Sequence, residues 1–293
     1  MLRTLLLLCG LLTAVAGGPL LAAEPQPQKL NVLILDGQNN HNWRATTPVI
    51  RALLEESGRF RVDVATMPTG PQNAAARQDF SPPLQEFDVV VSNYSDFGSE
   101  PAPKPFLDKL TQWVADGGGF VAVHAATAGL QHHAEYCRMI GLGWGGPNRG
   151  DRLVVDSSGN VVRTPKGQGS GTGHGAHGPI DVTVWSADHP VVKALPRTWR
   201  VERDELWFST RGPAEELTVL ATGYSPNTKQ NEPLLWTVGY GQGRVFVNLL
   251  GHDQNVMQDP GFRTTLLQGT EWAATGKVTL PVPQDFPGTA TEQ

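Results

Sequence analysis

Histidine is the residue type of this 293-residue chain best placed to carry chemistry. Three of its eight histidines, His41, His124 and His252, follow or lie close to the end of an apolar run that is typical of a β-strand. Imidazole titrates near neutral pH and is a frequent zinc ligand. We therefore expect His124 to be a catalytic base or a metal ligand. His41, His252 and the neighbouring Asp253 would contact substrate, with His252 also a candidate metal ligand. The alternative is that each histidine is a structural hydrogen-bonding residue.

A pair of adjacent carboxylates, Asp204 and Glu205, is the second candidate for chemistry. Neighbouring side chains of a β-strand point to opposite faces, so only one of the two can face a given pocket. We expect Glu205 to be that residue, either as the catalytic partner of His124 or as a metal ligand with His124 and His252. Trp207, two residues further on, would then share its face. The alternative is a solvated pair of charges.

A glycine-rich segment, residues 171–178, contains His174 and His177. Their spacing could hold a metal ion. No strand leads directly into the segment and no helix follows it, so it matches neither a phosphate-binding loop nor a dinucleotide fingerprint. The simpler interpretation is a mobile surface loop. His132 and His133 precede a short predicted helix, and we expect both to be exposed.

Tryptophans near these residues suggest a class of ligand. Trp43, Trp144 and Trp207 could stack on the apolar faces of sugar rings. Buried packing is the alternative for any single tryptophan. The pattern leaves both interpretations open, and a small-molecule carbohydrate is the kind of partner that stacking would suit.

Residues 1–23 predict a secretory signal peptide, because Arg3 precedes an apolar stretch that ends in small residues. Cleavage would leave residues 24–293 as a single domain, in the periplasm or outside the cell and not in the membrane. The alternative is a membrane anchor, but glycines and a proline interrupt the stretch and no flanking charges follow it.

Composition excludes two further classes. The chain has 23 Lys and Arg against 28 Asp and Glu, which gives a net charge of -5, and it has no run of basic residues. This charge pattern excludes a nucleic-acid-binding protein. With 39% hydrophobic and 17% charged residues, the chain is not disordered. After cleavage Cys137 would be the remaining cysteine, and its apolar surroundings predict a small core residue. A homo-oligomer remains open.

The order of the predicted elements indicates how these residues are positioned. Strands and helices alternate in the first half of the chain, which favours a three-layer, doubly wound α/β fold with a mostly parallel, flavodoxin-like sheet. Ligands of such sheets bind beyond the carboxyl ends of the strands. The predicted strands are 30–35, 60–64, 88–92, 120–123, 180–185, 217–222, 234–238 and 244–249, and the predicted helices follow Thr47 as N-cap and cover 105–115 and 260–274.

The joint pattern resembles the ThuA-like family, of the trehalose-utilisation type. The resemblance covers essentially the whole chain after residue 23, although each matching piece is short. The matching pieces are residues 41–43, 45–48, 87–91, 117–126, 139–144, 188–190, 204–206, 232–236, 241–246, 250–253 and 269–274.

The resemblance implies the fold of the class I glutamine amidotransferases. Those enzymes carry a cysteine where His124 stands, so a thioester route and glutamine hydrolysis are not expected. The family also implies a carbohydrate-processing enzyme acting on glycosides, including oxidised 3-keto forms, by hydrolysis, elimination or isomerisation. A divalent metal such as zinc is a candidate cofactor. The alternatives are a non-catalytic sugar-binding module and a structural or partner-binding protein, which would leave the histidines unexplained.

Overall fold

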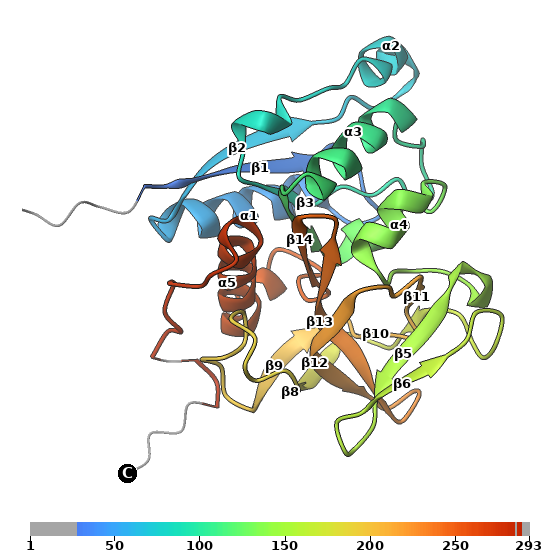
Figure 1. The fold of residues 1–293 in the computed structure, drawn as a ribbon, viewed down its shortest axis with the longest axis vertical. Coiled ribbons are helices and arrows are strands. Elements are labelled where there is room, and N and C mark those ends of the chain that lie inside the picture. The colour runs from blue at the N-terminus through green and yellow to red at the C-terminus, as the bar shows by residue number, and fades with distance from the viewer. Residues whose placement is uncertain (1–27, 285, 289–293) are drawn as a thin grey trace, which may run out of the picture.

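A twisted mixed sheet forms the centre of the computed structural model, which describes residues 28–284 and 286–288 (Figure 1). The predicted signal peptide, 1–23, lies outside these residues. Five strands form the parallel half of the sheet. In spatial order they are β2 (Phe60–Thr66), β1 (Leu30–Asp36), β3 (Val89–Ser92), β4 (Gly119–Val123) and β14 (Gly243–Asn248).

The second half of the sheet is antiparallel, so the prediction of a mostly parallel sheet does not hold. From β14 the order continues through β13 (Gln230–Tyr240), β12 (Leu217–Ser225), β8 (Gly178–Val184) and β9 (Thr198–Asp204). Short connections link β12 to β13 and β13 to β14, and such hairpins join only antiparallel strands. The prediction extended the strand–helix alternation of the first half to a region that lacks it.

Helices cover both faces of the parallel half, as the three-layer prediction requires (Figure 1). α1 (Trp43–Glu56) and α5 (Pro260–Thr275) pack against each other on one side. α3 (Lys104–Ala115) and α4 (Ala134–Ile140) pack together on the other. β3 and β4 are buried throughout and β1 and β14 over most of their length, as strands covered on both faces must be, whereas the edge strand β2 alternates between buried and exposed residues.

Three segments differ from the prediction. α1 begins at Trp43 instead of after Thr47, because the Asn42 carbonyl accepts the amides of Ala45 and Thr46 in the first turn; Pro48 therefore lies inside the helix. Residues 68–83, for which no helix or strand was predicted, contain η1 (Pro71–Asn73) and α2 (Ala74–Gln78). Residues 141–179, also without a predicted element, contribute β5 (Asp151–Val155), β6 (Val161–Thr164) and β7 (Gly173–His174).

The remaining elements are short. β11 (Arg211–Gly212) pairs with β5, and β10 (Trp207–Phe208) pairs with β7 in a separate two-stranded sheet. The other single turns are η2 (Leu84–Glu86), η3 (His124–Thr127), η4 (Pro147–Arg149) and η5 (Val256–Gln258). Within the described residues, no helix has the length and apolar character needed to span a membrane.

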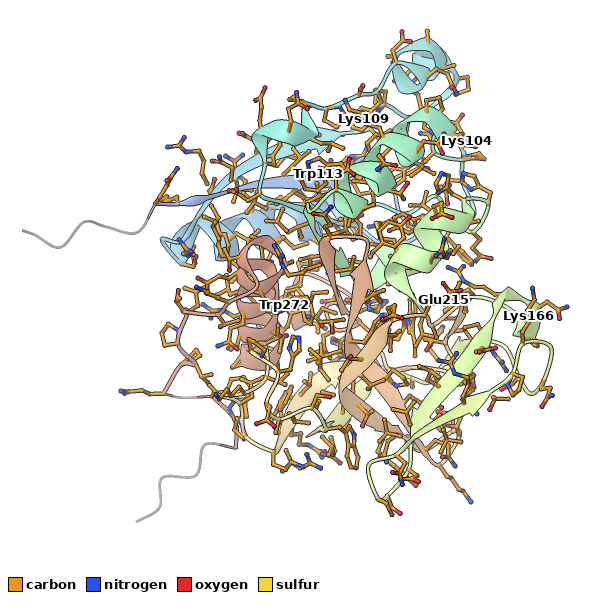
Figure 2. All side chains as sticks on the ribbon, in the orientation of Figure 1. Lys104, Lys109, Trp113, Lys166, Glu215 and Trp272 are labelled. Carbon is orange, nitrogen blue, oxygen red and sulfur yellow. The ribbon has the colours of Figure 1, made fainter. Side chains whose placement is uncertain are left out.

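Charged side chains mark the outside of this architecture. Lys104, Lys109 and Lys166 are exposed and lie at the periphery, the first two on α3 and the third beside β5 and β6 (Figure 2). Lys104 pairs with Asp108 one turn further along α3, which is a solvated contact.

Strand direction brings residues from both halves to one edge. Four antiparallel pairings separate β14 from β9, and an even number of reversals restores the original direction. Flat strands four places apart would lie about 19 Å from each other. Yet the Gly251 amide, just after β14, donates a 2.7 Å hydrogen bond to Asp204 at the end of β9. The antiparallel half must therefore curl back over the carboxyl edge of the parallel half.

Candidate active site at the carboxyl edge of the sheet

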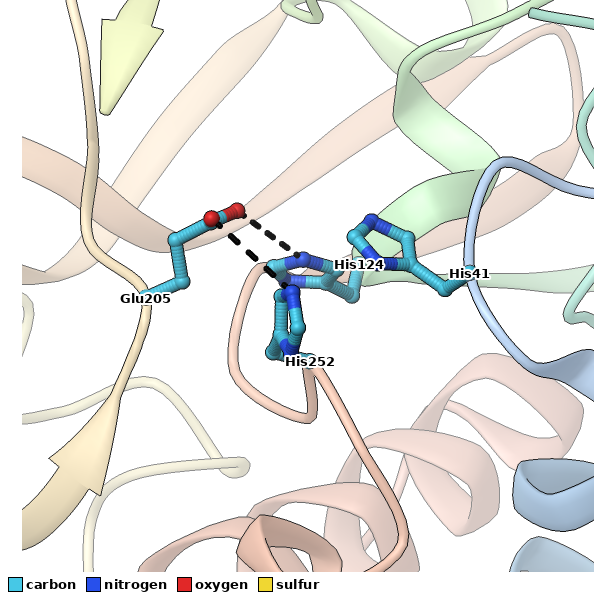
Figure 3. Close-up of side chains that lie close together, drawn as sticks. All are labelled: His41, His124, Glu205 and His252. Carbon is cyan, nitrogen blue, oxygen red and sulfur yellow. Dashed lines mark ion pairs between the residues drawn. The ribbon is translucent and has the colours of Figure 1, made fainter. Parts of the chain in front are cut away.

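The three strand-end histidines meet at this edge, as their positions in the sequence predicted (Figure 3). His41 follows β1, His124 follows β4 and His252 follows β14. Their ring centroids are 5.0 Å apart for His41 and His124, 4.4 Å for His41 and His252, and 5.4 Å for His124 and His252. The parallel half of the sheet thus supplies three imidazoles to one place.

His124 is held by backbone geometry in a single orientation. It opens η3 with a φ of 39°, which is the left-handed region, and its ring is buried. Its Nδ1 donates to the Leu249 carbonyl at 2.6 Å, so Nε2 faces the site. This buried Nε2 has no hydrogen-bond partner among the described residues and lies 3.6 Å from Oε2 of Glu205. Burial lowers the pKa of His124, but the carboxylates of Glu205 and Asp204 outweigh it and the net pKa is raised.

Glu205 comes from the antiparallel half and faces all of these rings. Its Oε2 accepts a 2.7 Å hydrogen bond from Nε1 of Trp207. Its Oε1 lies 3.0 Å from Nδ1 of His174, 3.4 Å from Nε2 of His177 and 3.9 Å from Nε2 of His252. Burial raises the pKa of Glu205, but His124 and the Trp207 hydrogen bond outweigh it, and the pKa falls to about 2. Glu205 is therefore ionised at neutral pH.

Asp204 is not among the residues that line the cavity beside this cluster or form its candidate metal-binding set, in keeping with the division between the two carboxylates that strand alternation predicted. Its carboxylate is buried and accepts backbone hydrogen bonds from Gly251 at 2.7 Å, His252 at 3.3 Å and Glu205 at 2.7 Å. Burial raises the pKa of Asp204. These hydrogen bonds hold the segment that carries His252 against the end of β9. Asp204 and Glu205 are both buried, so the alternative of a solvated pair of charges does not hold.

His174 and His177 belong to the cluster, although the sequence favoured a mobile surface loop for them. His174 is in β7, whose antiparallel pairing with β10 places His174 opposite Trp207. His177 lies with its ring centroid 4.1 Å from that of His252. The two histidines three residues apart were visible in the sequence, but the pairing of two two-residue strands was not.

A cavity of about 160 Å³ opens beside the cluster. We call it the aromatic cavity, because Phe97, Trp144 and Trp207 form its walls; His41, His174 and Glu205 also line it. Trp43, an expected sugar contact, is not among the lining residues, and the guanidinium of Arg44 lies 4.2 Å from the centre of its ring.

Three other residues lie outside the cluster. His132 is exposed as expected, but His133 is buried, because it accepts a hydrogen bond from the Tyr136 amide at the start of α4 and contacts Asp108 at 2.9 Å. Cys137 is buried in α4, and burial raises the pKa of its thiol. It is a core residue, as predicted.

The donor set of the cluster fits a divalent metal ion. One ligand atom each from His41, His124, Glu205 and His252 lies within 4.8 Å of the other three. Burial, together with the neighbouring imidazoles, lowers the pKa of His41 to about 3 and also lowers that of His252, so both rings are neutral as metal ligation requires. The Leu249 carbonyl fixes the tautomer of His124 that leaves Nε2 free to bind, a typical outer-shell arrangement.

A second potential donor set, His177, His252 and Asp253, shares His252 with the first. Asp253 is already engaged, since one carboxylate oxygen accepts the amides of Asn255 and Val256 before η5. Asp253 also does not line the aromatic cavity, so its predicted contact with substrate gains no support from the structure.

Comparisons with known proteins agree with this architecture. The profile of the ThuA family, described as trehalose utilisation, matches residues 31–273. A putative ThuA-like protein from Parabacteroides merdae is 35% identical with a TM-score of 0.82, over 89% of this chain and 96% of its own. A second, from Bacteroides uniformis, shares the fold at 18% identity and a TM-score of 0.58, over 90% of this chain and 99% of its own. No curated protein matches the chain.

Proposed function

The chain belongs to the ThuA family, and on that premise we propose that it is an exported, metal-dependent enzyme that processes a carbohydrate. The observation that carries the proposal is the four-residue donor set of His41, His124, Glu205 and His252 beside the aromatic cavity. A buried carboxylate among imidazoles, next to aromatic walls, combines a reactive centre with a surface suited to sugar rings.

The four residues would hold a divalent cation such as zinc, bound through imidazole nitrogens and one carboxylate. Such a cation would supply Lewis-acid polarisation of a substrate oxygen. Trp207 supports this role of Glu205, because its indole N–H orients the carboxylate. A carboxylate with a pKa of about 2 is a weak base, so Glu205 is better suited to holding positive charge than to accepting a proton from carbon.

His174 is the residue best placed to move a proton. It lines the aromatic cavity, is about half exposed, and lies 3.0 Å from Glu205, which would orient its ring. In a keto-glycoside the C–H next to the carbonyl is acidic, and its proton must leave as the glycosidic oxygen is expelled. His174 would accept that proton as the C–H and glycosidic C–O bonds break and a C=C bond forms, and the expelled oxygen would take up a proton from solvent, while Trp144 and Trp207 hold the sugar ring in place. Isomerisation would need the same transfer of the C–H proton without loss of the glycosidic oxygen, whereas direct hydrolysis would not need it.

Metal analysis combined with turnover tests the proposal. The protein without residues 1–23, purified and analysed by elemental mass spectrometry, is expected to carry about one divalent ion per chain. His124→Ala and Glu205→Gln should lose it. His189→Gln is the matched control, since His189 contacts Trp272 away from the cluster. A panel of oxidised and unmodified glycosides should include a substrate whose turnover stops with a chelator and returns with zinc.

Two results would contradict the proposal. Turnover that survives metal depletion would rule out the role of the cation. Sugar binding without turnover across the whole panel would instead indicate a non-catalytic sugar-binding module.

A further inference from the structure

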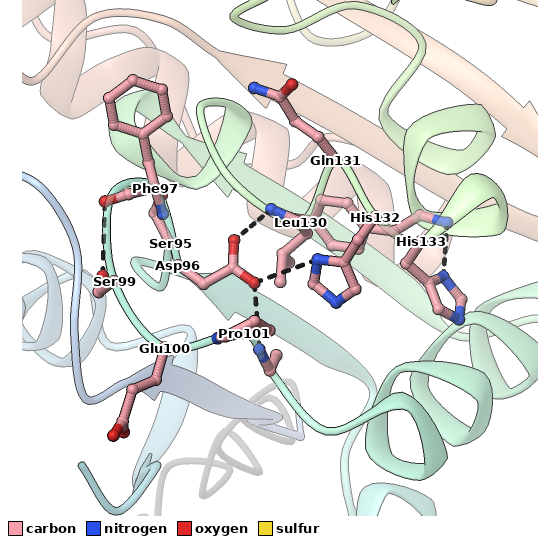
Figure 4. A network of polar contacts seen from close by, with 12 residues as sticks. Ser95, Asp96, Phe97, Ser99, Glu100, Pro101, Leu130, Gln131, His132 and His133 are labelled. Atoms are coloured by element: carbon pink, nitrogen blue, oxygen red, sulfur yellow. Dashed lines mark hydrogen bonds and ion pairs between the residues drawn. The ribbon is translucent and has the colours of Figure 1, made fainter. Parts of the chain in front are cut away.

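A second cavity of about 300 Å³ adjoins the aromatic cavity. We call it the Asp96 cavity, after the carboxylate in its wall. The two cavities share Phe97 and Ala128 as lining residues, so they adjoin on either side of these two residues. The segment after β3 supplies Asp96 and Phe97, and the segment after η3 supplies Leu130 to His132 (Figure 4). The same strand ends that build the candidate active site therefore build this cavity.

The polar groups of the Asp96 cavity are held in fixed positions. One oxygen of Asp96 accepts the Leu130 amide at 2.5 Å, and the other accepts the Ala102 amide at 3.0 Å and lies 3.5 Å from Nδ1 of His132. The carboxylate is buried, whereas the His132 side chain is 41% exposed. A carboxylate has about four acceptor positions. Asp96 and His132 thus offer hydrogen-bond acceptors and a ring nitrogen to hydroxyl groups.

Gln131 and Phe97 connect this polar wall to the aromatic cavity. The Gln131 side-chain amide donates to the carbonyls of Ala128 at 3.1 Å and Trp144 at 2.9 Å. The ring of Phe97 is 39% exposed and meets Trp144 edge to face, with 6.2 Å between centroids. An exposed phenylalanine between two cavities is a suitable platform for the apolar face of a sugar ring.

The charge of the two cavities limits the ligand. Among the described residues, neither Lys nor Arg lines either cavity, whereas Asp96 and Glu205 contribute carboxylates. Phosphate and carboxylate groups are normally recognised by arginine, lysine or helix N-termini. A phosphate or carboxylate on the sugar unit in the Asp96 cavity would therefore meet only the Asp96 carboxylate and the His132 imidazole as charged or titratable groups.

We infer that the Asp96 cavity is a second sugar-binding subsite and that the substrate is an uncharged glycoside of at least two units. The reacting unit lies in the aromatic cavity beside Glu205, and the second unit lies between Phe97 and His132. This inference rests on the proposed function, because it assigns the position of the leaving group in the same reaction.

Ligand titration tests the inference on the protein without residues 1–23, followed by tryptophan fluorescence and saturation-transfer NMR. The probes are glucose, the neutral disaccharides trehalose, maltose and cellobiose, and trehalose 6-phosphate. We expect at least one neutral disaccharide to bind about tenfold more tightly than glucose, and the phosphate to bind about tenfold more weakly than trehalose.

Variants locate the effect. His132→Ala should weaken disaccharide binding about fivefold and leave glucose binding unchanged, because His132 lines only the Asp96 cavity of the two. Phe97→Ala should weaken both ligands, because Phe97 lines both cavities. Val161→Ala, exposed on β6, is the control and should change neither.

The outcomes separate this inference from the proposed function. Equal affinity for glucose and every disaccharide, or a loss in His132→Ala that is the same for both, would overturn the second subsite while metal-dependent turnover could still stand. Preferred binding of the phosphate would overturn the neutral-substrate conclusion. Absence of both carbohydrate binding and turnover would overturn the proposed function, and the subsite with it.

Discussion

Two buried glutamates, Glu205 and Glu271, show how a functional carboxylate differs from a structural one. Glu271 lies in α5, at the side of the sheet covered by helices. Arg59 contacts its Oε1 at 2.8 Å, and Thr279 and Leu280 supply hydrogen bonds of 2.6–3.0 Å. All of these groups keep their donor hydrogens at neutral pH. Glu271 is therefore fully satisfied and has no capacity left for a ligand.

The surroundings of Glu205 are of another kind. Trp207 donates a hydrogen bond to it, and its other described polar neighbours are imidazoles: His174 at 3.0 Å, and His177, His124 and His252 at 3.4–3.9 Å, beyond the usual hydrogen-bond distance. Imidazole nitrogens gain and lose protons near neutral pH and bind metals. Burial alone therefore does not identify a functional carboxylate. The type of its hydrogen-bond partners, and how closely they contact it, distinguishes the two glutamates.

The largest expected effect is on activity, in Glu205→Gln. Loss of the negative charge removes one ligand of the proposed metal ion and the group that orients His174. Turnover of a confirmed substrate should therefore fall by about 10²–10⁴-fold. The amide is isosteric and can keep the Trp207 hydrogen bond, so the variant should stay folded, although loss of a charge whose pKa the fold lowers to about 2 should reduce the free energy of unfolding by about 1–3 kcal/mol. Steady-state kinetics and urea denaturation measure the two. Full turnover in the variant would remove Glu205 from the mechanism.

Glu271→Gln should give the opposite pattern. Removing one partner of a buried ion pair leaves Arg59 without its counter-charge, and the free energy of unfolding should fall by about 3–5 kcal/mol. Turnover per folded molecule should stay at the wild-type value, because α5 supplies no residue to the cluster. If Glu271→Gln were stable but inactive, Glu271 would have a role in turnover, and the distinction between a structural and a functional glutamate would be wrong.

Most of what the sequence predicted at the site depended on the parallel half of the sheet. His41, His124 and His252 could be placed together because carboxyl ends of parallel strands share one edge. Glu205 was assigned correctly to the cleft by alternation, since β9 ends at Asp204 and the next side chain turns the other way.

The rest required tertiary information. The curl of the antiparallel half, which brings Glu205 over His124, depends on long-range pairing that no local pattern encodes. The β7–β10 pairing that places His174 spans two residues on each side, too short for a periodic signal. His133 looked exposed because its partner Asp108 is on another helix.

The pH dependence of stability sharpens the same comparison. Burial raises the pKa of Glu271, but hydrogen bonds from Thr279 and Leu280 and the contact with Arg59 outweigh it, so the folded pKa lies below the ordinary value of 4.5. The unfolded chain then binds more protons as the pH falls, and the stabilisation present above 4.5 is lost through the folded pKa. The difference in unfolding free energy between wild type and Glu271→Gln should be constant well above the ordinary pKa of 4.5 and shrink as the pH falls below it. A difference that stays constant over this range would contradict the assignment.

The smallest expected effect concerns the hydrogen bond that Trp207 donates to Glu205. Trp207→Phe removes the 2.7 Å indole hydrogen bond while keeping most of the buried aromatic volume. A hydrogen bond to a charged acceptor contributes about 1.5 kcal/mol, so turnover should fall by about tenfold through misorientation of the carboxylate. Trp236→Phe is the matched control, because Trp236 is equally buried and its indole donates at 2.8 Å to the Ile140 carbonyl, outside the cluster. Both variants should lose a similar, small amount of stability, and only Trp207→Phe should lose activity. Equal turnover in the two variants would mean that the imidazoles alone position Glu205. Glu205 would then depend only on titratable partners, whereas Glu271 depends only on donors that do not titrate near neutral pH.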